Sequence, residues 1–263
     1  MSTSFPMDGK RVRFSGETNV GMKRDHNEDS FYLPVSERLA IVADGMGGHA
    51  SGEVASKIAV ETVAGYFKAT ENAQPLTWPF KVDRDNQANV NRMTVGIKLA
   101  NQQIFEEAEQ NPACHGMGTT IVAAHFLDDE LIVGHVGDSR LYRVRDGAID
   151  QITQDHSLLN DYIKMKHLTE AEIAAFPQKN VIVRALGMKA SVEVDIFHDT
   201  PRIGDLYLLC TDGLSGLISD EEITALAMDE RDLDGLCSRL IAAANASGGH
   251  DNITVVCARI EPL

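Results

Sequence analysis

The sequence has no run of about 18 apolar residues, the length that a membrane-spanning helix needs. Its first residues, Met1 to Pro6, also lack the order of a secretory signal, in which basic residues precede an apolar stretch. These absences argue against membrane insertion and against export. We therefore expect a soluble, cytoplasmic protein with no membrane partner.

Clusters of Lys and Arg are missing as well. The 24 Lys and Arg residues are outnumbered by 39 Asp and Glu, which gives a formal net charge of -15 at pH 7. Proteins that bind nucleic acids neutralise phosphates with Lys and Arg, so we expect no nucleic-acid partner. A strongly acidic chain is better suited to binding metal cations.

Several signatures of other enzymes and metal sites are also absent. No Gly-x-Ser-x-Gly elbow marks a serine hydrolase, and no glycine-rich loop ends in Gly-Lys-Ser/Thr as a P-loop does. The cysteines show no Cys-x-x-Cys spacing, which predicts buried free thiols rather than a zinc site or disulfides. They are Cys114, Cys210, Cys237 and Cys257.

What is present indicates one α+β domain over residues 1–263, since 43% hydrophobic content allows a substantial core. Short β-rich segments at hairpin spacing favour antiparallel sheets, packed together with helix pairs outside. Strands are expected over 11–18, 30–35, 38–43, 119–127, 131–136, 141–145, 148–152, 181–186, 192–199, 205–210 and 252–260, and helices over 50–68, 94–110, 220–228 and 233–246. A connection over 69–91 and a flap over about 155–178 complete the chain.

Four Asp residues lie at the ends of predicted strands, namely Asp44, Asp138, Asp212 and Asp251. Any single Asp-Gly pair is more typical of a simple turn. The ends of neighbouring strands meet in space, however, and four carboxylates so close together would raise one another's pKa unless cations lay between them. The pattern therefore predicts a site for hard divalent metals, with oxygens from the Asp44 side chain and the Gly45 carbonyl.

The loop over 21–30 adds Arg24, Glu28 and Asp29. On composition alone, this segment is equally consistent with a solvated loop. As a functional segment, it would supply Glu28 and Asp29 as further metal ligands, direct or through water. Arg24 would then be a forked donor for a phosphate or carboxylate.

Six motifs occur in a fixed order: Arg24 with Glu28-Asp29, Asp44-Gly45-Met46-Gly47-Gly48-His49, Gly116-Met117-Gly118-Thr119-Thr120, Gly137-Asp138-Ser139-Arg140, Thr211-Asp212-Gly213-Leu214 and Gly249-His250-Asp251-Asn252-Ile253-Thr254. This order resembles that of the metal-dependent protein phosphatases of type 2C, in particular their compact bacterial branch. The similarity runs from about Phe14 to Arg259, and six ordered motifs are a highly specific signal.

The resemblance implies a four-layer α-β-β-α sandwich with a binuclear magnesium or manganese centre at one end of the two sheets. It implies that Asp44 bridges both metals and that the Gly45 carbonyl binds one of them. Asp212 and Asp251 would bind the other.

The remaining acidic residues would have supporting roles in the same family pattern. Glu28 and Asp29 would hold the second metal or its waters, and Asp138 together with Asp212 would match a weaker third-metal site. Arg24 would bind the substrate phosphate, and residues 155–178 would be the variable flap of the family.

Two positions depart from the pattern of animal members. Where those proteins carry a His proposed as general acid, this chain has Met46, which cannot donate a proton. His49 is the nearest candidate for that role, although it is equally suited to a structural one. Gly216 stands where animal members have an Asp, which weakens the expectation of a third metal.

Other polar residues are expected to have structural roles. His156 is expected to cap a helix at the start of the flap, and His135 to be a hydrogen-bonded core residue. Ser139 and Arg140 should fix the Asp138 loop, and Asn252 should do the same for Asp251.

We therefore predict a manganese- or magnesium-dependent phosphatase that hydrolyses phosphoserine and phosphothreonine. The ions would activate a water for direct attack, and an oxygen-rich ligand set favours these metals over zinc. By resemblance, the expected partners are serine/threonine kinases and their substrates, and we expect a monomer. The alternative is a catalytically silent module of the same fold that binds phosphoproteins or a kinase. A phosphodiesterase or nuclease would call for His ligands and a basic groove, and neither is evident.

Overall fold

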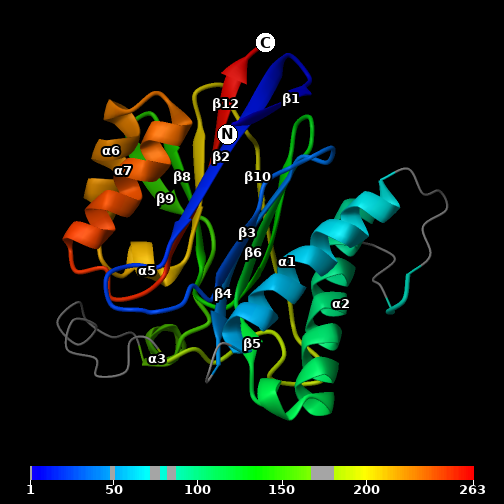
Figure 1. Cartoon of the computed structure of the whole chain (residues 1–263). Coiled ribbons are helices and arrows are strands. Elements are labelled where there is room, and N and C mark those ends of the chain that lie inside the picture. Colours follow the sequence, from blue (N-terminus) through cyan, green and yellow to red (C-terminus); the bar gives the residue numbers. More distant parts are fainter. Residues whose placement is uncertain (1, 48–50, 72–77, 82–86, 167–180) are drawn as a thin grey trace.

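Two antiparallel sheets form the centre of the computed structural model, which describes residues 2–47, 51–71, 78–81, 87–166 and 181–263 (Figure 1). The first sheet has the order β1-β2-β12-β11-β8-β9, and the second has the order β10-β7-β6-β4-β3 with β5 beside β4. The strands are β1 (Thr3–Met7), β2 (Lys10–Asn19), β3 (Asp29–Tyr32), β4 (Leu39–Met46), β5 (Gly118–Thr119), β6 (Ile121–Phe126), β7 (Leu131–Val136), β8 (Arg140–Arg145), β9 (Ala148–Gln151), β10 (Asp195–Asp199), β11 (Leu206–Cys210) and β12 (Ile253–Pro262).

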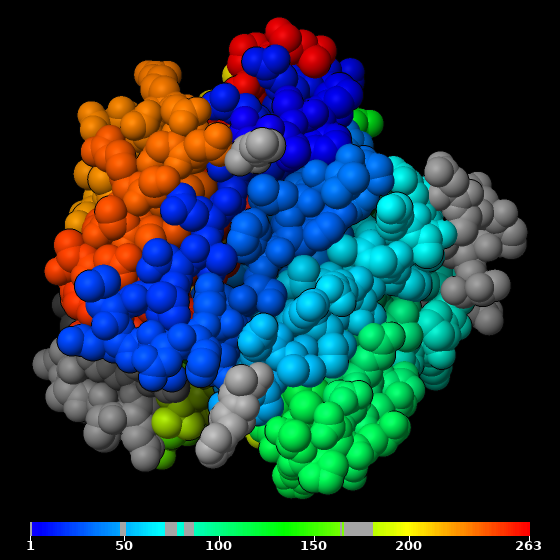
Figure 2. All heavy atoms as spheres, in the orientation of Figure 1, coloured from blue at the N-terminus to red at the C-terminus, as the bar shows by residue number. Residues whose placement is uncertain are grey.

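Two pairs of helices cover the outer faces of the sheets. Helices α1 and α2 lie against the sheet that contains β4, and α6 and α7 lie against the sheet that contains β12 (Figure 1). Figure 2 shows the two pairs as opposite flanks of the molecule, with the N-terminal strands between them. The helices are α1 (Ser51–Thr70), α2 (Ala88–Gln110), η1 (Pro112–Cys114), α3 (Leu158–Lys166), α5 (Asp212–Ser215), α6 (Asp220–Asp229) and α7 (Leu233–Ala246). The predicted α-β-β-α sandwich is thus confirmed.

Strand β4 shows why its sequence is an unbroken apolar run. Leu39, Ile41 and Ala43 point into the core beneath α1 and α2, whereas Ala40 and Val42 point into the core between the sheets. Because successive side chains alternate between faces, a strand buried on both faces needs apolar residues throughout. This burial fixes the direction in which the strand delivers Asp44.

The sequence periodicity of α1 also has a clear structural origin. Ala55, Ala59, Val63 and Phe67 recur at helical spacing, and all four are buried against the sheet. The small residues at the start of this stripe allow the helix to approach β4 closely near Asp44. Helix α2 extends the same layer and begins at Ala88, earlier than expected, because Val90 and Met93 also face this core.

Other expectations about the chain were wrong in detail. Strand β1 was not expected, and it forms the edge of the first sheet by pairing with β2. The segment over 181–186 is not a strand but makes two isolated bridges, Ser157 with Ile182 and Thr119 with Leu186. Strand β10 begins at Asp195 rather than at 192. The expected strand over 119–127 is divided into β5 and β6 at Thr120, whose N–H donates to the Asp44 carbonyl.

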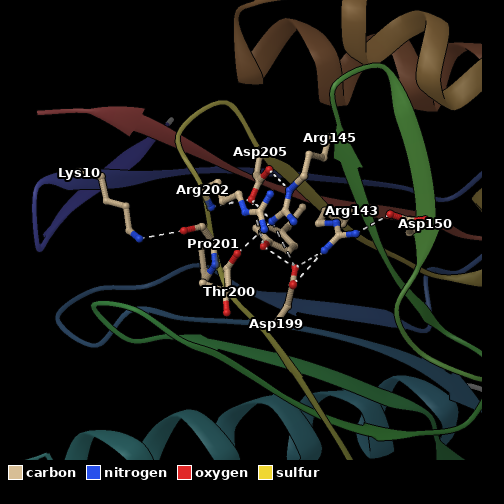
Figure 3. Close-up of polar contacts among 10 residues, drawn as sticks. Lys10, Arg143, Arg145, Asp150, Asp199, Thr200, Pro201, Arg202 and Asp205 are labelled. Atoms are coloured by element: carbon tan, nitrogen blue, oxygen red, sulfur yellow. Dashed lines mark hydrogen bonds and ion pairs between the residues drawn. The ribbon is translucent and has the colours of Figure 1, made fainter.

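A cluster of charged residues links the two sheets at the end away from Asp44 (Figure 3). Asp199 ends β10 in one sheet and accepts hydrogen bonds from Arg143 and Tyr207 of the other. Beside it, Asp205 accepts two hydrogen bonds of 2.7 Å from Arg145. These contacts hold the distal ends of the sheets together.

Two predictions from absences can be compared with the structure. All four cysteines are buried and free of disulfides, as expected. Within the described ranges, no helix has both the length and the apolar character needed to cross a membrane.

Candidate metal centre

The predicted acidic residues meet at one end of the facing sheets. Asp44 lies near the end of β4, Asp212 begins α5 directly after β11, and Asp251 stands shortly before β12. Together with Glu28 and Arg24, these three Asp residues line a cavity of about 230 Å³. Its wall is completed by Gly45, Met46, Gly47 and Ile182. The fold therefore gathers the carboxylates that the sequence separates most widely.

The carboxylates disturb one another's ionisation. Loss of hydration raises the pKa of Asp44 well above its ordinary value, and the charges of Asp29, Asp212, Asp138 and Asp251 raise it further. The pKa of Asp212 is also raised, first by burial and then by Asp251, while a hydrogen bond with Asp44 opposes the rise. A divalent cation would relieve this repulsion.

Asp29 presents a buried oxygen with no partner among the described residues. Only 8% of the residue is exposed, and Oδ2 accepts hydrogen bonds from Thr211 (3.0 Å) and Thr254 (2.7 Å). Oδ1 has no hydrogen-bond partner. Burial raises the pKa of Asp29 to about 7, although the two Thr hydroxyls act in the opposite direction. A buried, unsatisfied acceptor of this kind fits a cation or its water.

Asp138 has the same character on the other side of Asp212. It is 7% exposed, its Oδ1 is also unpartnered, and its pKa is raised to about 7 by burial and then by Asp212 and Asp155. It lines a second cavity of about 380 Å³ that shares Asp212 and Asp251 with the first. The walls of this second cavity come from α3, α5 and the loop before β12.

Gly45 allows the backbone to close tightly around Asp44. A Cβ atom at this position would lie 2.1 Å from the Gly52 carbonyl oxygen and 2.4 Å from that of Glu28. Neither contact is tolerable for a side chain. The glycine therefore lets the first turn of α1 and the Glu28 loop approach the end of β4.

Arg24 forms an ion pair at the mouth of the cavity. Its Nη2 atom lies 2.7 Å from Oδ2 of Asp251, and its side chain is 49% exposed. The hydrogen bond to Asp251 raises the pKa of Arg24 further, so the guanidinium is permanently charged. A cationic, forked donor beside a carboxylate cluster suits an anionic substrate.

Asn252 holds the Arg24 loop against the C-terminal part of the site. Its side-chain oxygen accepts from the Glu28 N–H (2.8 Å), and its amide nitrogen donates to the carbonyls of Val20 and His26. Its own N–H donates to Oδ1 of Asp251 (2.8 Å). Asn252 thus fixes Asp251, as expected, and also fixes the loop that carries Glu28.

The donor set of the site matches the chemistry of hard divalent metals. The candidate ligands are carboxylate and carbonyl oxygens, without His or Cys, which is the set that magnesium and manganese prefer. Across the described ranges, no three His, Cys, Asp or Glu side chains are already at coordination spacing. The unpartnered oxygens of Asp29 and Asp138 nevertheless make the residues present a chemical fit for such ions.

Some sequence predictions fall elsewhere. His49 lies outside the described residues, whereas Met46 lines the first cavity and Gly216 lines the second. His156 does not cap α3; Ser157 does, because its hydroxyl accepts from the Asn160 N–H (3.3 Å). His156 faces Gly137 instead.

The remaining predicted structural residues lie where expected, with one exception in detail. Ser139 contacts Thr120 (2.6 Å), and Arg140 binds Asp155 through several hydrogen bonds, so both support the Asp138 loop. His135 is buried with Nε2 3.0 Å from the Ser139 carbonyl, but its Nδ1 has no hydrogen-bond partner within the described part of the chain.

Sequence reasoning missed three residues that complete the site. Thr211 and Thr254 hold Asp29, and Ile182 adds an apolar wall to the first cavity. Thr211 and Thr254 stand next to or near Asp212 and Asp251 in their motifs, which was an available signal. Ile182 had none, since its segment is a short apolar run of the kind found in ordinary strands.

The sandwich and its carboxylate cluster define a class of metal-dependent phosphatases. The family model described as Protein phosphatase 2C matches residues 22–250. The chain belongs to this family.

Individual relatives agree with that assignment. The serine/threonine phosphatase Stp of Listeria monocytogenes is 35% identical over 246 residues, which cover 91% of this chain and 92% of Stp. The crystal structure of the Mycobacterium tuberculosis serine/threonine phosphatase PstP/Ppp matches with a TM-score of 0.82 at 35% identity, covering 95% of this chain and 99% of that one. A structure of the PstP catalytic domain with two manganese ions matches at 0.78, with 34% identity and coverage of 95% and 98%. The present chain is a serine/threonine protein phosphatase of this metal-dependent family.

Proposed function

We propose that this phosphatase hydrolyses phosphoserine and phosphothreonine in proteins at the cavity lined by Asp44, Asp212 and Asp251. The observation that carries the proposal is the convergence of these carboxylates with two buried, unpartnered carboxylate oxygens nearby. Two Mn²⁺ or Mg²⁺ ions, when bound, would lower the pKa of a water towards neutrality and stabilise charge on the phosphoryl group. No covalent nucleophile of the protein is needed.

The proposed ligand roles are those implied by the resemblance, and they are consistent with the residues that line the cavity. Asp44 would help to hold both ions, and the Gly45 carbonyl would help to hold one of them. Asp212 and Asp251 would hold the other. Burial and repulsion from neighbouring carboxylates raise the pKa of Asp44 and that of Asp212, and cation binding would relieve this repulsion.

Glu28, Asp29 and Asp138 would complete the site from its edges. Glu28 lines the first cavity, and Asp29 lies behind it with one free oxygen, so both suit direct or water-mediated contact with the second ion. Asp138 with Asp212 would offer a weaker third position. Gly216 contributes no carboxylate there, which is consistent with weak binding.

Arg24 would bind and orient the substrate phosphate. In the structure its guanidinium is paired with Asp251, which is a proposed ligand. A cation that shares the charge of Asp251 would leave the guanidinium to face an anionic phosphate. For the proton needed by the leaving alkoxide, Met46 is chemically unsuitable, and His49 remains our proposed general acid.

The protein substrates would contact the second cavity and the flap. Leu159 and Asn160 of α3 line that cavity beside Asp138. We propose phosphorylated serine/threonine kinases and their substrates as partners. We also propose that the protein is a monomer and that residues 1–263 form one phosphatase domain. A catalytically silent binding module is disfavoured, because the three central Asp residues are all present.

A phosphopeptide assay with a metal titration tests the proposal. Metal-free protein should release phosphate from a phosphothreonine peptide only after Mn²⁺ or Mg²⁺ is added. The Asp44→Asn variant should release no phosphate even when the metal is added. Full turnover in excess chelator would contradict the proposed mechanism.

A further inference from the structure

His156 lies at the start of the flap, between β9 and α3, and is only 5% exposed. None of the roles proposed above uses it. We propose that His156 is a positioning residue that holds the Asp138 turn, the start of the flap and the segment over 181–184 in one fixed arrangement. This inference rests on the metal-binding role proposed for Asp138.

The first group that His156 holds is Gly137, the residue before Asp138. The Gly137 N–H donates to Nδ1 of His156 (3.0 Å), and the His156 N–H donates to the Gly137 carbonyl (2.7 Å). Gly137 has a φ of 113°, and a Cβ there would lie 2.6 Å from Cβ of Thr120. The turn is therefore a tight backbone structure whose buried N–H depends on one side-chain acceptor.

The second edge of the imidazole faces Asp195. Nε2 lies 3.1 Å from both Oδ2 of Asp195 and Nη1 of Arg184. Because Nδ1 accepts a hydrogen bond, the proton of the neutral ring lies on Nε2, so this nitrogen donates to Asp195 and cannot accept from the guanidinium. Arg184 pairs with the other oxygen of Asp195 at 2.5 Å. The ring thus joins Gly137 to an ion pair on β10 and on the segment that returns from the flap.

The backbone of His156 holds that returning segment as well. The Val183 N–H donates to the His156 carbonyl (2.9 Å), and the Leu158 N–H donates to the Val181 carbonyl (2.8 Å). Between these two contacts, Ser157 forms a bridge with Ile182, which lines the catalytic cavity. His156 therefore contacts the Asp138 turn and the segment that begins at Val181, and it stands at the start of the flap.

The Asp138 turn is connected in turn to Asp44. The hydroxyls of Ser139 and Thr120 lie 2.6 Å apart, and Thr120 accepts from the Asp44 N–H (2.9 Å). His135 lies 4.8 Å from His156 between ring centroids and contacts the Ser139 carbonyl. A continuous series of contacts thus connects His156 to both proposed ligands.

Two substitutions separate the two edges of the ring. In His156→Asn, Oδ1 takes the place of Nδ1 and keeps an acceptor for Gly137, but the side chain is too short to reach Asp195. In His156→Gln, the amide reaches Asp195 but no longer offers an acceptor at the position of Nδ1. We expect His156→Gln to weaken Mn²⁺ binding by about 10-fold or more, as the loss of residues that orient ligands does. His156→Asn should bind Mn²⁺ nearly as well as the wild type.

The direct measurement is calorimetric titration of metal-free protein with Mn²⁺, repeated in an Asp138→Ala background. If His156 acts through Asp138, the effect of His156→Gln should disappear in that background. If His156→Gln weakens Mn²⁺ binding by the same factor in both backgrounds, the inference is overturned. If Asp138→Ala alone leaves Mn²⁺ binding unchanged, both the proposed role of Asp138 and this inference fail. If only the His156 variants are without effect, the inference alone fails.

His125→Gln is the matched control. His125 is also buried (6% exposed), but its ring makes an edge-to-face contact with that of Phe67, and it lies on β6 opposite Leu39, at the far end of β4 from Asp44. The His125→Gln substitution should lower the melting temperature without changing the affinity for Mn²⁺.

A second measurement uses the wild type and so does not depend on the folding of a variant. Nitrogen-detected NMR of the histidine rings should show His156 protonated on Nε2 and not on Nδ1. The opposite tautomer would overturn the inference.

Discussion

The guanidinium of Arg24 lies 2.7 Å from the carboxylate of Asp251, so a proposed phosphate-binding group and a proposed metal ligand are in direct contact. Removing this cation should impair substrate binding more than metal binding. We expect Arg24→Ala to reduce kcat/KM for a phosphopeptide by about 10- to 100-fold, mainly through KM, because a charge-assisted hydrogen bond to phosphate is lost.

The control for Arg24→Ala is Arg231→Ala, which removes an exposed arginine just after α6. Its kinetics should match those of the wild type. If Arg24→Ala instead weakens Mn²⁺ binding while leaving KM unchanged, Arg24 has a structural role through Asp251.

Substitution of the central carboxylates should separate activity from folding. Asp212→Asn keeps the size of the side chain but removes a charge from the cavity, so phosphomonoester hydrolysis should be abolished while the fold is retained. Circular dichroism and phosphate release are the measurements. Asp146→Asn is a suitable control, since it removes a carboxylate from an exposed turn where φ is 52° and Asn is well tolerated. A folded Asp212→Asn protein with the turnover of the wild type would contradict the proposed role of Asp212.

The sequence alone was sufficient to predict the layers and the central carboxylates. Apolar runs such as Leu39 to Ala43 must be strands buried on both faces, and the Asp residues at their ends were expected to meet. The segment around Ile182 was predicted as a strand because its apolar residues continue over several positions. In the structure this segment makes only two isolated bridges, one from Ile182 to Ser157 and one from Leu186 to Thr119. Its conformation therefore depends on distant partners that no local pattern reveals.

Gly45 should be intolerant of even one added carbon. Gly45→Ala places a Cβ against the carbonyl oxygens of Gly52 and Glu28, so the protein should lose stability and respond poorly to Mn²⁺. Gly65→Ala provides the contrast, because Gly65 is an exposed position in α1 with no atom within 4 Å of the new carbon. That change should raise the free energy of unfolding by about 1 kcal/mol, since Ala favours a helix. Thermal melts with and without Mn²⁺ compare the two.

The metal-free protein should be more stable in mild acid than at neutral pH. The pKa of Asp29 and that of Asp138 are each raised to about 7, whereas in an unfolded chain Asp titrates near 3.9. Between about pH 4 and pH 7 these carboxyls, together with that of Asp44, whose pKa is raised well above its ordinary value, hold more protons in the native state than in the unfolded state. Burial lowers the pKa of His125 and that of His135 to about 3, which acts in the opposite direction but through fewer groups. The free energy of unfolding must therefore fall as the pH rises through this interval, and level off above it.

Chemical unfolding in the presence of a chelator, at about pH 5 and about pH 8, measures this slope. Asp29→Asn should make the slope shallower, because the Asn oxygen still accepts from Thr211 and Thr254 but no longer titrates. Added Mn²⁺ should restore stability at the higher pH by binding the native state. Stability that rises with pH in the chelated protein would contradict the prediction.

The charged cluster at the distal end of the sheets allows a test of stability apart from catalysis. Burial by itself would raise the pKa of Asp199, but hydrogen bonds from Tyr207, the Thr200 N–H and Arg143 hold that pKa below its ordinary value. Such a group stabilises the native state above its ordinary pKa, and this contribution is lost as the pH falls through the lowered value.

We therefore expect Asp199→Asn to lower the free energy of unfolding by about 1 to 3 kcal/mol at pH 7, with kcat/KM unchanged. The difference from the wild type should shrink in acid, where the carboxylate of the wild type is also protonated. Asp150→Asn is the matched comparison, because Asp150 pairs with the same Arg143 at 2.6 Å but is 53% exposed. An exposed ion pair contributes about 1 kcal/mol or less, so this variant should be nearly as stable as the wild type. Equal losses in urea unfolding of the two variants would show that linking the sheets through Asp199 adds nothing beyond a surface ion pair.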